Sequence, residues 1–121
     1  MTLLRQDETA GFDPGRIDDL FTQLGPAAAE ELVCRTLEEL AARLTHAERC
    51  HRRGRLDEMR KTARGLCGVS DQLGLVLLAR VARDVIACAE LGDRVALAAT
   101  LARLLRVGER SLTEVWAFRD T

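Results

Sequence analysis

The placement of proline and glycine constrains this chain more than any other feature. Both prolines, Pro14 and Pro26, lie near the N-terminus, and none follows. In the proline-free part, Gly54, Gly74 and Gly92 separate stretches in which leucine and alanine recur at helical spacing. Aromatic residues make up only 3% of the chain, which leaves little material for strands. We therefore expect an all-α protein.

Length and composition indicate one globular domain. The chain has 121 residues, of which 47% are hydrophobic and 31% charged. No apolar run approaches the roughly 18 residues that span a bilayer, and the N-terminus carries acids where a signal peptide would be cationic. We therefore expect a cytoplasmic protein that binds no membrane.

The four cysteines are expected to be reduced thiols in that compartment. They form no Cys-x-x-Cys pair, and Cys50 and His51 have no neighbours at metal-ligand spacing. We expect no metal site and no cofactor. The cysteines are Cys34, Cys50, Cys67 and Cys88.

The hydrophobic pattern predicts a flexible tail over residues 1–13 and a single helical domain over 14–121. A short helix is predicted over 14–24, and longer helices over 26–53, 55–74, 75–91 and 94–118. Four long helices with short connections favour an antiparallel up-down-up-down four-helix bundle, with the short helix as an extra N-terminal element. Gly92 is expected to end a helix, Asp93 to cap the next, and Gly108 to allow a kink.

Apolar positions at three- and four-residue steps predict the core. The candidates are Ile17, Leu20, Phe21 and Leu24, then Leu37, Leu40, Leu44 and Ala47, then Leu56, Met59, Ala63, Leu66, Ser70 and Leu73, and finally Val95, Leu101, Leu105, Leu112 and Val115. Val76, Leu77 and Leu78 beside Leu75 look apolar all round, which fits either deep burial or a homodimer surface.

The opposite face of the 55–74 helix carries the candidate site. Five residues on it are predicted to face solvent, namely Arg60, Arg64, Cys67, Gly68 and Asp71. Between Arg49 and Arg64 there are seven basic and two acidic residues, an excess of +5 in a chain of net charge −1. A basic face can simply be solvated and paired with nearby acids, and this alternative is kept open.

The segment "GRLDEMRKTARGLCGVSDQLGLVLLARVARDVIACAELGD" resembles the histidine-phosphotransfer (HPt) domains of bacterial multistep phosphorelays. The resemblance extends from about Ile17 to Trp116. HPt domains typically read Ala-His-x-Leu-Lys-Gly-x-Ser-x-x-x-Gly-Ala on this helix. The corresponding residues here are Ala63, Arg64, Gly65, Leu66, Cys67, Gly68, Val69, Ser70, Leu73, Gly74 and Leu75.

The resemblance implies which positions would act. In HPt domains the exposed histidine takes a phosphoryl group from a receiver-domain aspartate, the lysine three residues later steadies the phosphoryl oxygens, and the next glycine leaves room for the partner. Here Arg64 stands at the histidine position and Cys67 at the lysine position, and Gly68 is retained. Arginine stays protonated and offers no lone pair. We therefore expect a protein that is not an enzyme and does not relay phosphate through Arg64.

Two histidines remain as alternative phosphoacceptors. His46 and His51 both lie on the preceding helix, without the motif around them, and ordinary exposed histidines are expected there. Cys67 is predicted to be exposed near Arg60 and Arg64, where its pKa could be lowered, although a plain surface cysteine is the simpler interpretation.

The resulting hypothesis is an HPt-like signalling domain that binds a receiver domain or a histidine kinase as a modulator or inhibitor. Arg64 would meet the acidic pocket of a receiver through a bidentate contact to a carboxylate. The alternatives are phosphotransfer through His46 or His51, and a homodimerising helical module. Nucleic-acid binding is not expected, because no aromatic residues are interleaved with the basic ones.

Overall fold

The computed structural model describes residues 11–120, with side chains as far as residue 118. Helices and their connections account for the described residues, which contain no β-strand. The prediction of an all-α chain is therefore confirmed. No helix in this part of the chain combines the length and the apolar character needed to cross a membrane. In chain order the helices are α2 (Pro14–Leu24), α3 (Pro26–Arg52), α4 (Leu56–Gln72), α5 (Val76–Leu91) and α6 (Arg94–Asp120).

Glycines lie at each connection between these helices. Gly25, Gly54, Gly74 and Gly92 have φ angles of 85°, 72°, 71° and 74°, and no other described residue has a positive φ. Only glycine adopts this left-handed region without a steric cost. The predicted glycine stops at residues 54, 74 and 92 are therefore confirmed.

Aspartates begin the first and the last of these helices. The Asp13 carboxylate accepts a hydrogen bond from the Gly15 N–H (3.0 Å), and Pro14 follows at the first helical position, where a proline is tolerated. The Asp93 carboxylate accepts a hydrogen bond from the Ala96 N–H (3.0 Å) at the start of α6. The predicted capping role of Asp93 is confirmed.

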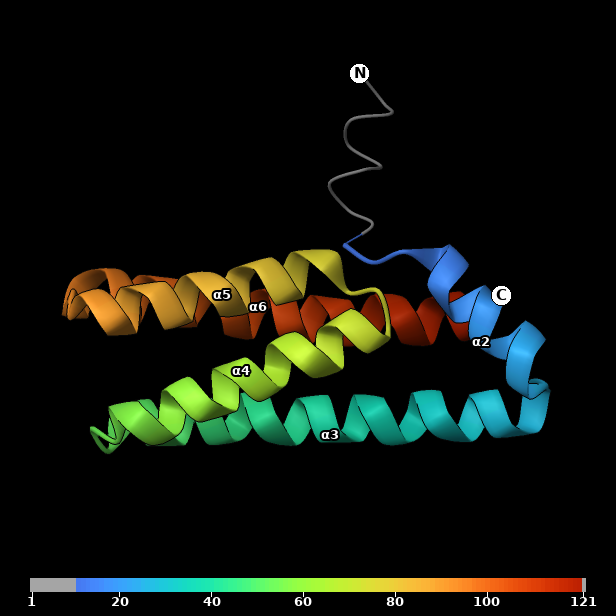
Figure 1. Cartoon of the computed structure of the whole chain (residues 1–121), viewed down its shortest axis with the longest axis horizontal. Coiled ribbons are helices and arrows are strands. Elements are labelled where there is room, and N and C mark those ends of the chain that lie inside the picture. Colours follow the sequence, from blue (N-terminus) through green and yellow to red (C-terminus); the bar gives the residue numbers. More distant parts are fainter. Residues whose placement is uncertain (1–10, 121) are drawn as a thin grey trace, which may run out of the picture.

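The helices pack mainly against their neighbours in the chain. α3 contacts α4, α4 contacts α5, and α5 contacts α6, while α3 also contacts both α2 and α6. In Figure 1 the chain reverses its direction at each connection from α3 to α6, and α4 lies between α3 and α5. α2 lies at the end of the molecule where α3 begins.

The core is formed from the predicted apolar stripes. All four stripe residues of α3 are buried, and so are the predicted core residues of α4 apart from its first. The largest side chains that are fully buried come from every helix and from one connection. They are Ile17, Val33, Leu40, Met59, Leu66, Leu73, Leu75, Leu78, Val81, Val85, Leu104 and Val115.

Three predicted core residues are exposed instead. Leu24 is 47% exposed, Leu56 is 38% exposed and Val95 is 82% exposed. Each lies at one end of its helix, Leu24 in the last turn of α2 and the other two in the first turns of α4 and α6. The apolar run after Gly74 is divided, because Leu75 and Leu78 are fully buried whereas Val76 is exposed.

The predicted flexible tail, residues 1–13, divides into two parts. Its first ten residues lie outside the described part of the chain, and its last three pack against helices. Phe12 is only 9% exposed, and its ring meets Phe118 edge-on with the centroids 5.6 Å apart. The Gly11 carbonyl accepts a hydrogen bond from the Leu77 N–H (3.2 Å). These three residues therefore belong to the folded domain.

Gly108 allows α3 and α6 to approach each other closely. It is buried, and a Cβ atom at this position would lie 2.5 Å from Cδ1 and 3.0 Å from Cδ2 of Leu44. Both methyl groups of a buried side chain would then have to move. The sequence allows a kink at Gly108, and the packing against Leu44 gives this residue a steric role within α6.

We expect Gly108→Ala to lower the free energy of unfolding by about 1–3 kcal/mol, because overpacking of Leu44 outweighs the better helix propensity of alanine. Gly68→Ala is the matched control, since a Cβ on that helical glycine meets no atom within 4 Å. The control should stabilise by up to about 1 kcal/mol. Urea denaturation of both variants measures the difference, and equal effects would contradict the steric role of Gly108.

Candidate functional site

Burial of one side of α4 determines which residues form its outer face. Met59, Ala63, Leu66 and Ser70 are fully buried where α4 packs against α3 and α5, so the opposite side of the helix points outward. All five predicted site residues lie on this outer side. Arg64, Gly68 and Asp71 are exposed, whereas Arg60 and Cys67 are half-buried.

Arg64 makes a loose contact with α5. Its side chain is 57% exposed, and its Nη2 atom lies 3.7 Å from Oε2 of Glu90, which is itself half-exposed. This separation is longer than a hydrogen bond, and exposed pairs of this kind contribute about 0–1 kcal/mol. The guanidinium can therefore leave Glu90 at little cost when a better acceptor approaches.

Arg60 is paired within its own helix. Its guanidinium donates a hydrogen bond to the carboxylate of Asp57, one turn earlier and almost fully exposed. Both arginines of the α4 face thus have acidic neighbours, as expected if this basic face is simply solvated and paired with nearby acids. Because these pairs are exposed, they leave the face available to a partner with a stronger acidic group.

The two glycines on this stretch of α4 have different surroundings. At Gly65 a Cβ atom would lie 2.1 Å from Nη1 of Arg43, so this glycine makes room for an α3 side chain. Arg43 is held there by Glu39, whose carboxylate lies 2.8 Å from its Nη2. At Gly68 a Cβ atom would meet nothing within 4 Å. No contact within the described residues requires glycine at 68, although glycine costs about 1 kcal/mol against alanine inside a helix.

Cys67 points toward α5 rather than into solvent. Its thiol donates a weak hydrogen bond to the Ala79 carbonyl (3.7 Å) and packs beside the core. Burial raises the pKa of this thiol, the charge of Arg83 opposes that rise, and Asp71 adds to it. The predicted exposure of Cys67 is therefore wrong, and so is the alternative that nearby arginines lower its pKa, because the side chain is half-buried between two helices.

Sequence reasoning missed the contribution of α5 to this face. Ala79, Arg83 and Glu90 are spaced so that they lie along one side of α5, and this side borders α4 at Cys67 and Arg64. Pairing adjacent antiparallel helices residue by residue would have pointed to these positions. Arg83 brings a positive charge next to Cys67.

Both histidines lie on α3, away from the outer face of α4. His46 Nε2 lies 3.3 Å from a Glu58 carboxylate oxygen and 3.4 Å from the Cys50 sulfur. This histidine is therefore engaged between α3 and α4, and is not the freely solvated residue that we expected. His51 lines a pocket at the end of the molecule. No three His, Cys, Asp or Glu side chains among the described residues gather so as to hold a metal ion.

Comparisons with protein-family models, with curated proteins and with solved structures find no significant match for this chain. The likeness to HPt domains therefore rests on the sequence of residues 54–93.

We expect Cys67 to react slowly with iodoacetamide. Because burial raises its pKa, the thiolate fraction at pH 7.5 is smaller than in glutathione, and alkylation should accelerate only as the pH rises further. Peptide mass spectrometry after timed alkylation gives the rate at this cysteine. Arg83→Gln removes the opposing positive charge and should slow the reaction further, whereas a rate equal to that of glutathione would contradict the burial argument.

Proposed function

We propose that this chain is an HPt-like signalling domain whose helices α3 to α6 form an antiparallel up-down-up-down bundle. Three features support the architecture. Neighbouring helices contact in chain order, α3 and α6 also contact, and the chain reverses at each connection. α2 would be the extra helix at the N-terminal end, and the outer face of α4 would be the docking surface of the family.

The domain would bind a receiver domain, or a histidine kinase, without carrying phosphate itself. Arg64 stands at the phosphoacceptor position, and a guanidinium cannot act as the nucleophile. The position nevertheless projects into solvent beside an α5 that carries a further cation, Arg83. A surface that lacks the nucleophilic histidine and carries an exposed guanidinium is suited to binding.

The single observation that carries the proposal is the open space at Gly68. A helical glycine that costs stability, at a position where an added Cβ atom would meet nothing within 4 Å, is explained if a partner backbone approaches it. Gly68 lies one turn beyond Arg64 on the same face, so the same partner would reach both residues.

The electrostatics of the face match an acidic pocket. Arg60, Arg64 and Arg83 surround the site, while Glu90 and Asp57 each hold an arginine through an exposed contact. A carboxylate of the partner would replace Glu90 and form the bidentate contact that Glu90, at 3.7 Å, does not make. Charge complementarity of this kind acts mainly on the association rate and on partner choice.

We expect Arg64→Glu to weaken binding to the cognate receiver by at least about tenfold, since a charge-assisted contact becomes a repulsion. Glu90→Gln should strengthen the same binding by about two- to fivefold, because it frees the guanidinium from its internal partner. Titration against a panel of receiver domains, followed by calorimetry or fluorescence anisotropy, measures both effects.

Arg103→Glu on α6 is the matched control for this pair, because it makes the same charge change at an exposed position outside the α4 face. It should leave the affinity nearly unchanged. A loss as large as that of Arg64→Glu would indicate a non-specific charge effect and would overturn the assignment of the α4 face. Binding of no receiver at all would redirect the search to histidine kinases.

A bulky side chain at Gly68 provides a steric test. Gly68→Gln adds no charge and meets open space, so the fold should be retained or slightly stabilised. If the partner backbone approaches here, affinity should fall by about tenfold or more while thermal stability does not fall. Unchanged affinity in a folded Gly68→Gln variant would show that the partner does not pass over this glycine.

A further inference from the structure

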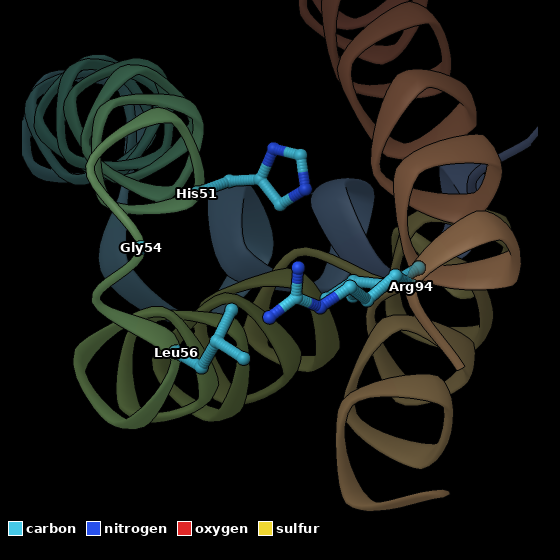
Figure 2. A pocket seen from close by; sticks show the side chains of 5 residues that line it. His51, Gly54, Leu56 and Arg94 are labelled. Carbon is cyan, nitrogen blue, oxygen red and sulfur yellow. The ribbon is translucent and has the colours of Figure 1, made fainter. Parts of the chain in front are cut away.

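A second feature with binding chemistry lies at the end of the molecule, outside the outer face of α4. A pocket of about 210 Å³ opens where the C-terminus of α3, the first turn of α4 and the first turn of α6 meet. Figure 2 shows the side chains of His51 and Arg94 extending toward each other from opposite sides of this opening, with Leu56 below them. The lining residues are His51, Gly54, Leu56, Arg94 and Leu97.

The two polar side chains of this pocket, His51 and Arg94, have no partner among the described residues. Arg94 makes no ion pair there, in contrast to Arg60 and Arg64, and the His51 ring makes no hydrogen bond. No carboxylate lines the pocket. The nearest acid along the chain, Asp93, uses its carboxylate to cap α6.

The surroundings add positive charge. Three exposed arginines lie at the end of α3 and in the turn that follows it, and no acidic residue lines the pocket to balance their charge. A ligand that enters here therefore meets cationic donors and a positive local potential. The three arginines are Arg52, Arg53 and Arg55.

The rest of the pocket is apolar. Leu97 is 3% exposed and belongs to the core cluster, so it forms a fixed wall. Leu56 is 38% exposed, which is unusual for the apolar stripe of α4 and leaves its side chain available for contact. A ligand with an apolar group beside its charge would cover surface that the protein leaves open to water.

The geometry points to a binding site for a small organic carboxylate, and we propose this as the ligand class. One guanidinium can grip both oxygens of a carboxylate, and one imidazole N–H can donate a further hydrogen bond. Two leucines accommodate a short aliphatic or aryl group. The volume is below the roughly 300–1,000 Å³ of pockets for larger ligands, so the compound is small. This inference is independent of the docking role of α4.

The test is an NMR titration of the full chain, labelled with ¹⁵N, with butyrate. Amide shifts should change in residues 51–56 and 94–97, and Arg94→Gln should raise the Kd by about tenfold or more. His51→Ala should also raise it. Arg103→Gln, an exposed arginine farther along α6, is the matched control and should bind as the parent does.

Two further probes separate the charge from the apolar contact. Butyramide has the same shape without the charge and should bind far more weakly. Along acetate, propionate and butyrate, each methylene should improve the Kd by up to about fourfold as it covers apolar surface. Equal responses to butyrate and butyramide, or unchanged binding in Arg94→Gln, would overturn the proposal. Inorganic phosphate binding as tightly as butyrate would overturn the organic-carboxylate assignment.

Discussion

The structure depends on the packing of α4 between α3 and α5. The buried row of Met59, Ala63, Leu66 and Ser70 fixes the rotation of this helix about its axis, so its opposite side must face outward. Small residues of α4 then allow the neighbouring helices to come close. On one side the Arg43 side chain of α3 lies over Gly65, and on the other the Cys67 thiol contacts Ala79 of α5. Any change that rotated α4 by one residue would bury Arg64 and expose the core.

This arrangement separates stability from recognition. The groups that hold α4 in place are apolar and buried, whereas the charged groups of its outer face form exposed pairs that contribute little to folding. Substitutions on the outer face can therefore accumulate without loss of the fold. Arg64 illustrates this, because its guanidinium determines the chemistry of the surface and takes no part in the buried packing of the helix.

Features that follow from local pattern could be predicted from the sequence. The helix limits, the glycine turns, the Asp93 cap and most of the core require only periodicity and turn chemistry. Features that depend on distances between helices could not be predicted from the sequence. The burial of Cys67, the space that Gly65 and Gly108 provide, and the convergence of His51 and Arg94 all require knowledge of how two helices approach. Burial near the helix ends was also mispredicted, since the apolar periodicity of α4 and α6 includes first-turn residues that are exposed, Leu56 and Val95.

The short segment before α2 has a consequence for the start of α5. No side chain caps that helix, and the carbonyl of Gly11 takes the Leu77 N–H instead, while the Asp13 N–H donates to the Gly74 carbonyl (2.8 Å). A segment distant in the chain thus satisfies a backbone N–H in the first turn of α5, which a capping side chain would otherwise do. The first turn of α5 and the N-terminal segment should consequently fray as one cooperative unit, with Phe12 against Phe118 as the contact that closes it.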